Sequence, residues 1–290
     1  MGRFSRVDKM ASMNPKDHPL FKQYPIKGTA QISCGEVPTP YHIYDGYGLF
    51  IGGACDLSAA RHLLKDEDLN LIETTDNKTP TGIWICNFTD ASLNPHHELQ
   101  FSFFSSKQRE KPTAPHPFNT LSIMLTHPDV QMLCHGLWNN TPLVVAYNRE
   151  LLSLNARLTE SKIEHASNSV NFSFKDSITG NSILSGSVRN PQRNSLLANL
   201  SFLSKIGFRR GSEIAKQPWT GMQVLNPKGV VLDRNATAKA FNKSDVNVVR
   251  YFDGQTSSLE FGNTPYRPLQ FSASFSQYMS GFKFVYLEPE

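Results

Sequence analysis

Short runs in which apolar and polar residues alternate recur along most of the chain. Alternation with period two places successive side chains on opposite faces, so each run predicts a half-buried strand of an antiparallel sheet. Leu99, Phe101 and Phe103 alternate with polar residues, and a turn at Thr179–Asn181 separates two later runs. The expected strands cover residues 47–54, 83–88, 99–103, 170–174, 184–188, 246–252, 271–275 and 282–286.

Two segments have the spacing of helices instead. Asp56 precedes a run in which Leu57, Ala60 and Leu64 recur at helical spacing, and its carboxylate is a good N-cap for that run. Residues 195–206 predict a second helix, which Gly207 would end. Many strands with a few flanking helices predict a β-rich α+β protein with a barrel-like or sandwich sheet.

Composition adds limits to this picture. The chain has 290 residues, of which 39% are hydrophobic, so it can bury a substantial core. Five prolines in residues 15–40 predict an irregular N-terminal arm over residues 1–40, followed by one domain over residues 41–290. The 19 phenylalanines suit a β-rich core or an apolar pocket.

Charge and motifs exclude several function classes. A formal net charge of +4 is too small to predict binding to nucleic acid or to a membrane surface. The sequence begins without an apolar run, and its four cysteines are widely spaced, which predicts a cytoplasmic protein with reduced thiols and no structural zinc. Phosphate-loop, dinucleotide-binding and common hydrolase motifs are absent from the sequence, so we expect no cofactor.

The strongest chemical constellation is His96, His97 and Glu98. In a strand, His96 and Glu98 would share one face and His97 would take the other. A carboxyl group beside an imidazole can move protons near neutral pH. The alternative is an exposed pair at the start of a strand. A metal site is not predicted, because no third ligand follows at a recognisable spacing.

Two segments resemble the acetoacetate decarboxylase superfamily. Residues 148–158 (NRELLSLNARL) are similar to the signature G-R-E-x-x-x-x-P-K-K-L, with Arg149, Glu150 and Leu158 matching. Residues 94–99 (NPHHEL) are similar to the element G-x-Y-x-E, and Glu98 falls on the family's active-site glutamate. Residues 256–269 are similar to a late strand and its Pro-Leu, so the resemblance covers roughly residues 40–287.

The resemblance implies an antiparallel, cone-shaped β-barrel around an apolar pocket, usually in a homo-oligomer. It also implies that the signature lines the pocket. Ala156 and Arg157 replace the lysine pair on which the family's decarboxylation depends. Alanine has no amine for a Schiff base, and a guanidinium is not deprotonated in proteins. Arg149 and Glu150 are expected to form an ion pair or cap a turn.

These residues predict an enzyme of altered chemistry. Glu98 and His96 would move protons, and Arg157 with Asn155 would stabilise negative charge on an oxygen. The remaining predicted substrate-binding residues are Ala156, His135, His97 and Trp219, although His135 is equally a candidate core histidine. The reaction would be a cofactor-free lyase, isomerase or cyclase step on an apolar carbonyl compound, such as a polyketide- or terpenoid-like intermediate.

Three alternatives remain open from the sequence. The same fold could carry a hydrophobic small molecule without catalysis. A β-keto acid decarboxylase could use a relocated lysine such as Lys162. Finally, an unrelated β-rich interaction protein would result if the resemblance were accidental. A polar cluster on the pocket wall would favour the enzyme, and a wall of Phe and Leu alone would favour the carrier.

Overall fold

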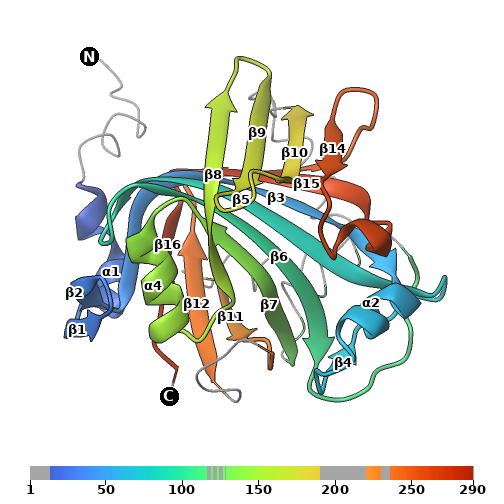
Figure 1. Ribbon diagram of the computed structural model, residues 1–290, viewed down its shortest axis with the longest axis horizontal. Helices are drawn as coiled ribbons and strands as arrows, with labels where there is room; N and C mark the ends of the chain where they lie inside the picture. The colour runs from blue at the N-terminus through green and yellow to red at the C-terminus, as the bar shows by residue number, and fades with distance from the viewer. Residues whose placement is uncertain are drawn as a thin grey trace, which may run out of the picture.

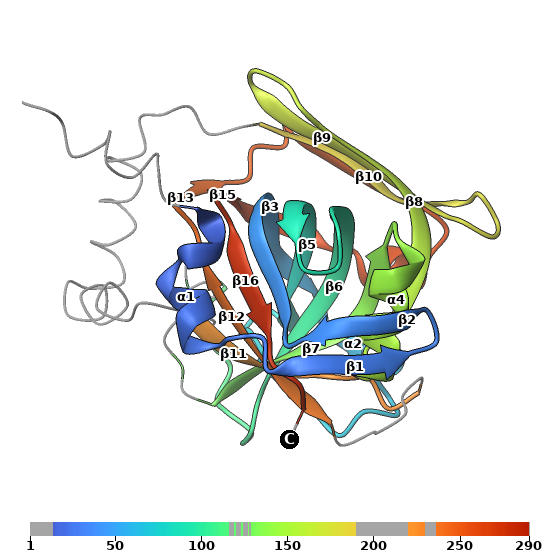
Figure 2. The ribbon, with the colours of Figure 1, turned by 90° about the vertical axis from the view of Figure 1, so that its left-hand side faces the viewer.

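The computed structural model describes residues 14–115, 119, 123, 127, 129–189, 220–229 and 236–289. Its main feature is a large sheet whose pairings return to their starting strand (Figures 1 and 2). The paired strands, in order around this circuit, are β3 (Tyr41–Asp56), β5 (Lys78–Ala91), β6 (His96–Ser106), β7 (Val130–Asn139), β11 (Thr220–Leu225), β12 (Thr237–Lys243) and β16 (Lys283–Tyr286). We call these the circuit strands. The cone shape expected from the resemblance stays a prediction.

A second set of strands leaves the circuit at β7. The last residues of β7 pair in parallel with β8 (Ala156–His165), while its first half pairs with β11. From β8 the outer sheet continues through β9 (Ser169–Asp176), β10 (Ser182–Arg189) and β14 (Ser258–Phe261). These strands project above the circuit in Figure 1 and cover one side of it in Figure 2.

Shorter elements complete the fold. On the circuit's edges, β15 (Ser272–Ser280) pairs with β3 and with β13 (Val246–Tyr251), and β4 (Asn70–Leu71) pairs with β6. Helix α4 (Pro142–Glu150) connects β7 to β8, and the short helix η2 (Arg267–Leu269) precedes β15. The strand predictions made from alternation therefore each fall within or overlap an observed strand, and the β-rich α+β class is confirmed.

Two apolar clusters lie on the two faces of the circuit. One joins residues from β3, β5, β6, β7, β11, β12 and β16 with residues of α4, so it lies on the side that the circuit encloses. The other joins the opposite face of β3, β5, β6 and β7 to the outer sheet and to helix α2 (Leu57–Leu63). We call the first the enclosed cluster, which lies on the enclosed face of the circuit. The second lies on the opposite face, which we call the outer face.

The predicted helix at residue 57 is confirmed together with its cap. Helix α2 starts at Leu57, and the Asp56 carboxylate accepts a hydrogen bond from the Ala59 amide at 2.7 Å. Leu57 and Ala60 point to the core, as their spacing requires. The helix expected at residues 195–206 lies outside the described residues. Within the described part of the chain, no helix is long and apolar enough to cross a membrane.

The irregular arm expected over residues 1–40 is wrong for residues 14–40. This stretch contains η1 (Pro15–Asp17), α1 (Pro19–Gln23) and the antiparallel pair β1 (Gly28–Ile32) and β2 (Gly35–Thr39). Pro15 and Pro19 stand at the first position of their helices, where the missing amide hydrogen is no loss. Pro38 lies on a two-stranded ribbon, which tolerates proline better than a central strand does.

Candidate functional site on the enclosed face

Strand register places Glu98 in a row of side chains across the enclosed face. Gly48 of β3 is opposite Cys86 of β5, Cys86 is opposite Glu98 of β6, and Glu98 is opposite Asn139 of β7. Residues opposite each other in paired strands point to the same side of the sheet. Because Cys86 belongs to the enclosed cluster, Glu98 also points into the enclosed side.

Glu98 is buried, with 5% of the residue's surface exposed. Within the part of the chain that the structure describes, one hydrogen bond reaches its carboxyl group, from Asn139 Nδ2 to Glu98 Oε2 at 3.1 Å. Burial disfavours the carboxylate and raises the pKa of Glu98 to about 7, although the Asn139 hydrogen bond acts in the opposite direction. Glu98 is therefore poised to accept or release a proton near neutral pH.

Phenols and thiols surround this carboxyl group. Burial, reinforced by the nearby Glu98 charge, raises the pKa of Tyr41 and Tyr286 well above the usual range for a phenol. The same two causes raise the pKa of the Cys86 and Cys134 thiols. All four groups stay neutral at physiological pH, so the two cysteines are not activated nucleophiles. Glu98 is thus the group in this cluster that titrates near neutrality.

His96 shares the enclosed face with Glu98, as predicted, but its ring is committed to other partners. Its Nδ1 lies 2.8 Å from the carbonyl oxygen of Asn94, and its Nε2 is hydrogen-bonded to Tyr41 Oη. A carbonyl only accepts, so Nδ1 carries the proton and Nε2 accepts the Tyr41 hydroxyl hydrogen. Burial lowers the pKa of His96 to about 4, which keeps the ring neutral. His96 therefore orients Tyr41.

His97 points to the outer face, as the alternation predicts. Its Nδ1 lies 2.9 Å from the hydroxyl oxygen of Ser161 on β8, and its amide donates to Asn140 Oδ1 at 2.7 Å. These contacts connect β6 to the outer sheet. His97 is thus separated from the enclosed side on which a substrate was expected to meet it.

The predicted pair Ala156 and Arg157 is divided between the two faces. Ala156 is opposite Leu137, belongs to the enclosed cluster and has 2% of its surface exposed. Arg157 is opposite Trp138, its guanidinium carbon lies 6.0 Å from the centre of that ring, and the residue is exposed. Adjacent strand residues face opposite ways, so Arg157 cannot join Glu98 while Ala156 occupies the enclosed face. The expected convergence of Arg157 with Glu98 is therefore wrong.

His135 and Asn155 stabilise the junction between β7 and β8. His135 is the extra residue of a bulge in β7, and its Nδ1 lies 2.8 Å from Tyr266 Oη. Asn155 Nδ2 donates to the His135 carbonyl oxygen at 3.2 Å. His135 also contacts Phe103 on the outer face, so the structure supports its alternative as a core histidine. Burial is the main cause that lowers its pKa to about 4. Trp219 lies outside the described residues.

The sequence interpretation missed Tyr41, Asn139, Asn148 and Tyr286. Asn148 Nδ2 donates to Asn139 Oδ1 at 3.0 Å, which extends the hydrogen bonding of Glu98 to helix α4. One sequence signal was available for Asn148. It lies one helical turn after Val144 on an apolar helix face, where a polar side chain needs a buried partner. Of the Arg149–Glu150 pair, Glu150 caps a turn, because its Oε2 accepts from the Ser33 amide between β1 and β2 at 2.9 Å.

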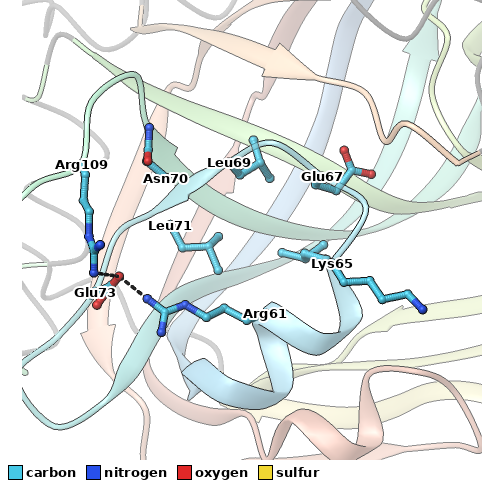
Figure 3. Close-up of a pocket in the computed structure, with 9 residues that line it drawn as sticks. Arg61, Lys65, Glu67, Leu69, Asn70, Leu71, Glu73 and Arg109 are labelled. Carbon is cyan, nitrogen blue, oxygen red and sulfur yellow. Dashed lines mark hydrogen bonds and ion pairs between the residues drawn. The ribbon is translucent and has the colours of Figure 1, made fainter.

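A separate pocket of about 300 Å³ lies beside α2 on the outside of the fold (Figure 3). Arg61 Nη2 lies 2.5 Å from Glu73 Oε1, and Arg109 Nη2 lies 3.9 Å from the same oxygen. Both arginine side chains are more than half exposed, so these ion pairs are a surface feature of small energetic weight. The buried chemistry lies on the enclosed face. Among the described residues, no three His, Cys, Asp or Glu side chains are grouped to hold a metal ion.

This strand circuit with its outer sheet is similar in overall fold to solved acetoacetate decarboxylases. The acetoacetate decarboxylase of Legionella pneumophila is 13% identical to this chain, with a TM-score of 0.56 over 96% of this chain and 97% of that one. A second acetoacetate decarboxylase structure is 14% identical, with a TM-score of 0.50 over 86% and 87%.

These likenesses show the fold, and the chain has the acetoacetate decarboxylase-like fold. No protein-family model matches the sequence, and no curated protein is significantly similar to it. The resemblance found in residues 94–99 and 148–158 therefore agrees with a structural likeness that extends over nearly the whole chain.

Proposed function

We propose that this protein is a cofactor-free enzyme, a lyase, isomerase or cyclase that binds an apolar carbonyl compound on the enclosed face. The observation that carries the proposal is Glu98, a buried carboxyl group with a pKa of about 7 at the centre of a polar cluster. Leaving a titratable group in such a place is costly for stability, which supports a chemical role.

The chemistry follows from the properties of Glu98. A carboxylate that is half protonated at neutral pH removes a proton from the carbon beside a carbonyl and returns it elsewhere on the substrate. The carbon loses a proton to Glu98 and forms an enolate, and Glu98 then delivers that proton to carbon or oxygen. The Tyr41 phenol lies close enough to Glu98 for its pKa to respond to the carboxylate charge, but its one hydrogen is donated to His96, so the proton transfers are assigned to Glu98 alone.

Imine-based decarboxylation has less support. Ala156 occupies the enclosed position of the signature and supplies no amine. Lys162, the proposed relocated lysine, is 70% exposed and paired with Glu164 at 2.8 Å on the outer sheet. Lys283 is the only buried lysine among the described residues, and its ammonium group contacts Asp245 and the Gly281 carbonyl oxygen. None of these offers a free amine beside Glu98.

A non-catalytic carrier of a hydrophobic small molecule is the second candidate. The observation that favours it is the aromatic content of the enclosed cluster, which includes Phe50, Phe88, Phe104, Phe275 and Phe282. Such a wall suits an apolar ligand. It does not account for a carboxyl group that titrates near neutrality in the same cluster, so the enzyme is the better supported function.

Exchange of substrate hydrogen for deuterium tests the proposal and does not require the product to be identified. The protein is incubated in D₂O with a panel of apolar ketones and β-keto esters, and loss of the α-hydrogen signal is followed by NMR. Glu98→Gln should slow exchange by about 100- to 10,000-fold, because an amide cannot exchange a proton at neutral pH. Glu164→Gln is the matched control, since Glu164 is exposed on the outer sheet.

The two candidates give different results in this experiment. Exchange that Glu98→Gln leaves unchanged would overturn the role of Glu98. Tight binding of a panel compound without exchange, equal in the native protein and in Glu98→Gln, would make the carrier the better account.

A further inference from the structure

Three buried side chains from three separate elements form one hydrogen-bonded chain. Asn148 Nδ2 on α4 donates to Asn139 Oδ1 at the end of β7, at 3.0 Å. Asn139 Nδ2 donates to Glu98 Oε2 on β6, at 3.1 Å. The exposed fractions of Asn139 and Asn148 are both 0%. The chain therefore runs from a helix, across a strand end, to the proposed acid–base group without contact with solvent.

We propose that Asn139 and Asn148 are positioning residues for Glu98, in which Asn148 fixes the orientation of the Asn139 amide and Asn139 holds the Glu98 carboxylate. The direction of these two hydrogen bonds follows from the chemistry of the groups. An ionised carboxylate only accepts hydrogen bonds, so Asn139 must present its nitrogen to Glu98. Its oxygen then faces away and requires a donor, which Asn148 supplies. Without Asn148 the Asn139 amide would be free to rotate and turn its oxygen toward the carboxylate.

The side-chain oxygen of Asn148 supports a specific role for its side-chain nitrogen, Nδ2. Asn148 Oδ1 is buried, and no hydrogen-bond partner reaches it from the described residues. A buried acceptor without a partner costs free energy, so an apolar residue would suit this position better if packing were its only purpose. The backbone of Asn148 is also held, since its carbonyl accepts from the Leu154 amide at 2.8 Å. The signature that this segment resembles has glycine here, so the side-chain donor is a feature of this chain.

Among the described groups that face Glu98, Asn139 is the one that lowers the pKa of Glu98 against the effect of burial. Tyr41 of β3, Cys86 of β5, Cys134 of β7 and Tyr286 of β16 all surround the carboxyl group and all stay neutral near pH 7. The Asn139 hydrogen bond favours the ionised carboxylate and lowers the pKa of Glu98, while burial raises it. Loss of Asn139 should therefore raise the pKa further.

Carbon-13 NMR of glutamate-labelled protein measures the pKa of Glu98 directly, with Glu98→Gln assigning the signal. Asn139→Ala should raise this pKa by about one unit or more, because hydrogen bonds to charged groups are strong. Asn148→Ala should raise it by less. In the Asn139→Ala background, Asn148→Ala should add nothing, since Asn148 acts through Asn139. Asn87→Ala is the matched control. Asn87 lies on β5, next to the strand of Glu98, and faces away from Glu98. Its side chain donates to Tyr47 Oη at 3.1 Å.

An unchanged pKa of Glu98 in Asn139→Ala, or an additive effect in the double variant, would overturn the proposal that Asn148 acts on Glu98 through Asn139. If Asn139→Ala does not fold, Asn148→Ala alone decides, because an unchanged pKa in that variant has the same meaning. The proposal rests on the proposed function for its effect on turnover, but the titration needs no substrate. A shifted pKa of Glu98 in the asparagine variants, together with normal exchange activity in Glu98→Gln, would uphold the positioning role of Asn139 and Asn148. The same pair of results would reject the proposed role of Glu98.

Discussion

Tyr41 and His96, 55 residues apart in the sequence, are joined by a buried hydrogen bond between the phenol oxygen and Nε2 of the imidazole. The other ring nitrogen donates to the Asn94 carbonyl oxygen, so the ring is fixed at both ends. The phenol is thereby held beside Glu98 in one orientation. His96 was predicted to move protons, but its imidazole instead holds the Tyr41 hydroxyl group in place.

Tyr41→Phe should destabilise the protein by about 1–3 kcal/mol, because it leaves a buried imidazole nitrogen without its donor. Chemical unfolding at pH 7.5, where His96 is neutral, measures the change. Tyr47→Phe is the control on the same strand, since its phenol is half-buried and accepts a hydrogen bond from Asn87. Equal effects of the two substitutions would contradict a special role for the Tyr41–His96 bond.

Glu98→Gln should change how stability depends on pH. The pKa of Glu98 is about 7 in the folded protein and near 4.5 in the unfolded chain. The folded state therefore binds the extra proton between these values, and the native protein loses stability as the pH rises from about 4.5 to 7. A glutamine has no such loss. We expect the variant to gain roughly 3 kcal/mol over the native protein between pH 4 and pH 8, measured as the difference in unfolding free energy.

Two results would contradict this expectation. A constant difference between the two proteins across this pH range would mean that Glu98 titrates normally when folded. A loss of relative stability in Glu98→Gln at high pH would mean that the carboxylate is better stabilised than its surroundings indicate.

Borohydride reduction in the presence of a β-keto acid should trap no adduct at residues 155–157, because Asn155, Ala156 and Arg157 carry no primary amine. Peptide mass spectrometry after digestion is the measurement. An adduct on Lys162 would be informative, since that lysine is exposed and paired with Glu164 in this structure. Finding such an adduct at substoichiometric keto acid would restore decarboxylation as the leading function.

Asp56→Ala should lower the unfolding free energy by about 1 kcal/mol, because helix α2 loses the side chain that caps its first turn. Asp56→Asn should recover most of this, since an amide oxygen also accepts from the Ala59 amide. Ser58→Ala serves as the control, because Ser58 is an exposed residue in the same first turn of the helix. Thermal unfolding of the three variants distinguishes a cap from a general effect of substitution in this segment.

Local patterns in the sequence predicted what depends on neighbouring residues. Alternation placed His96 and Glu98 on one face and His97 on the other, and the Asp56 cap fixed the start of α2. Alternation cannot tell which face becomes enclosed, because that depends on pairing between distant strands. The position of Arg157 on the outer face follows from the pairing of Leu137 with Ala156, which no local pattern contains.

The missed residues have the same explanation. Tyr41, Asn139, Asn148 and Tyr286 reach the Glu98 cluster from four elements, and each is an ordinary residue in its own segment. Only the register of the assembled sheet brings them together. The error over residues 14–40 had a local cause instead, since prolines taken as breaks in structure occupy positions that helix starts and short ribbons accept.

The division of strand β7 between two partners has a consequence for how such chains vary. One edge of β7 pairs with β11 near its start and with β8 near its end. The circuit around Glu98 is therefore complete without β8, β9, β10 and β14. Insertions, deletions or sequence drift in the outer sheet would leave the ring of backbone hydrogen bonds intact. The outer sheet therefore acts on the surroundings of Glu98 through side-chain packing against the outer face, and not through the backbone pairings of the circuit.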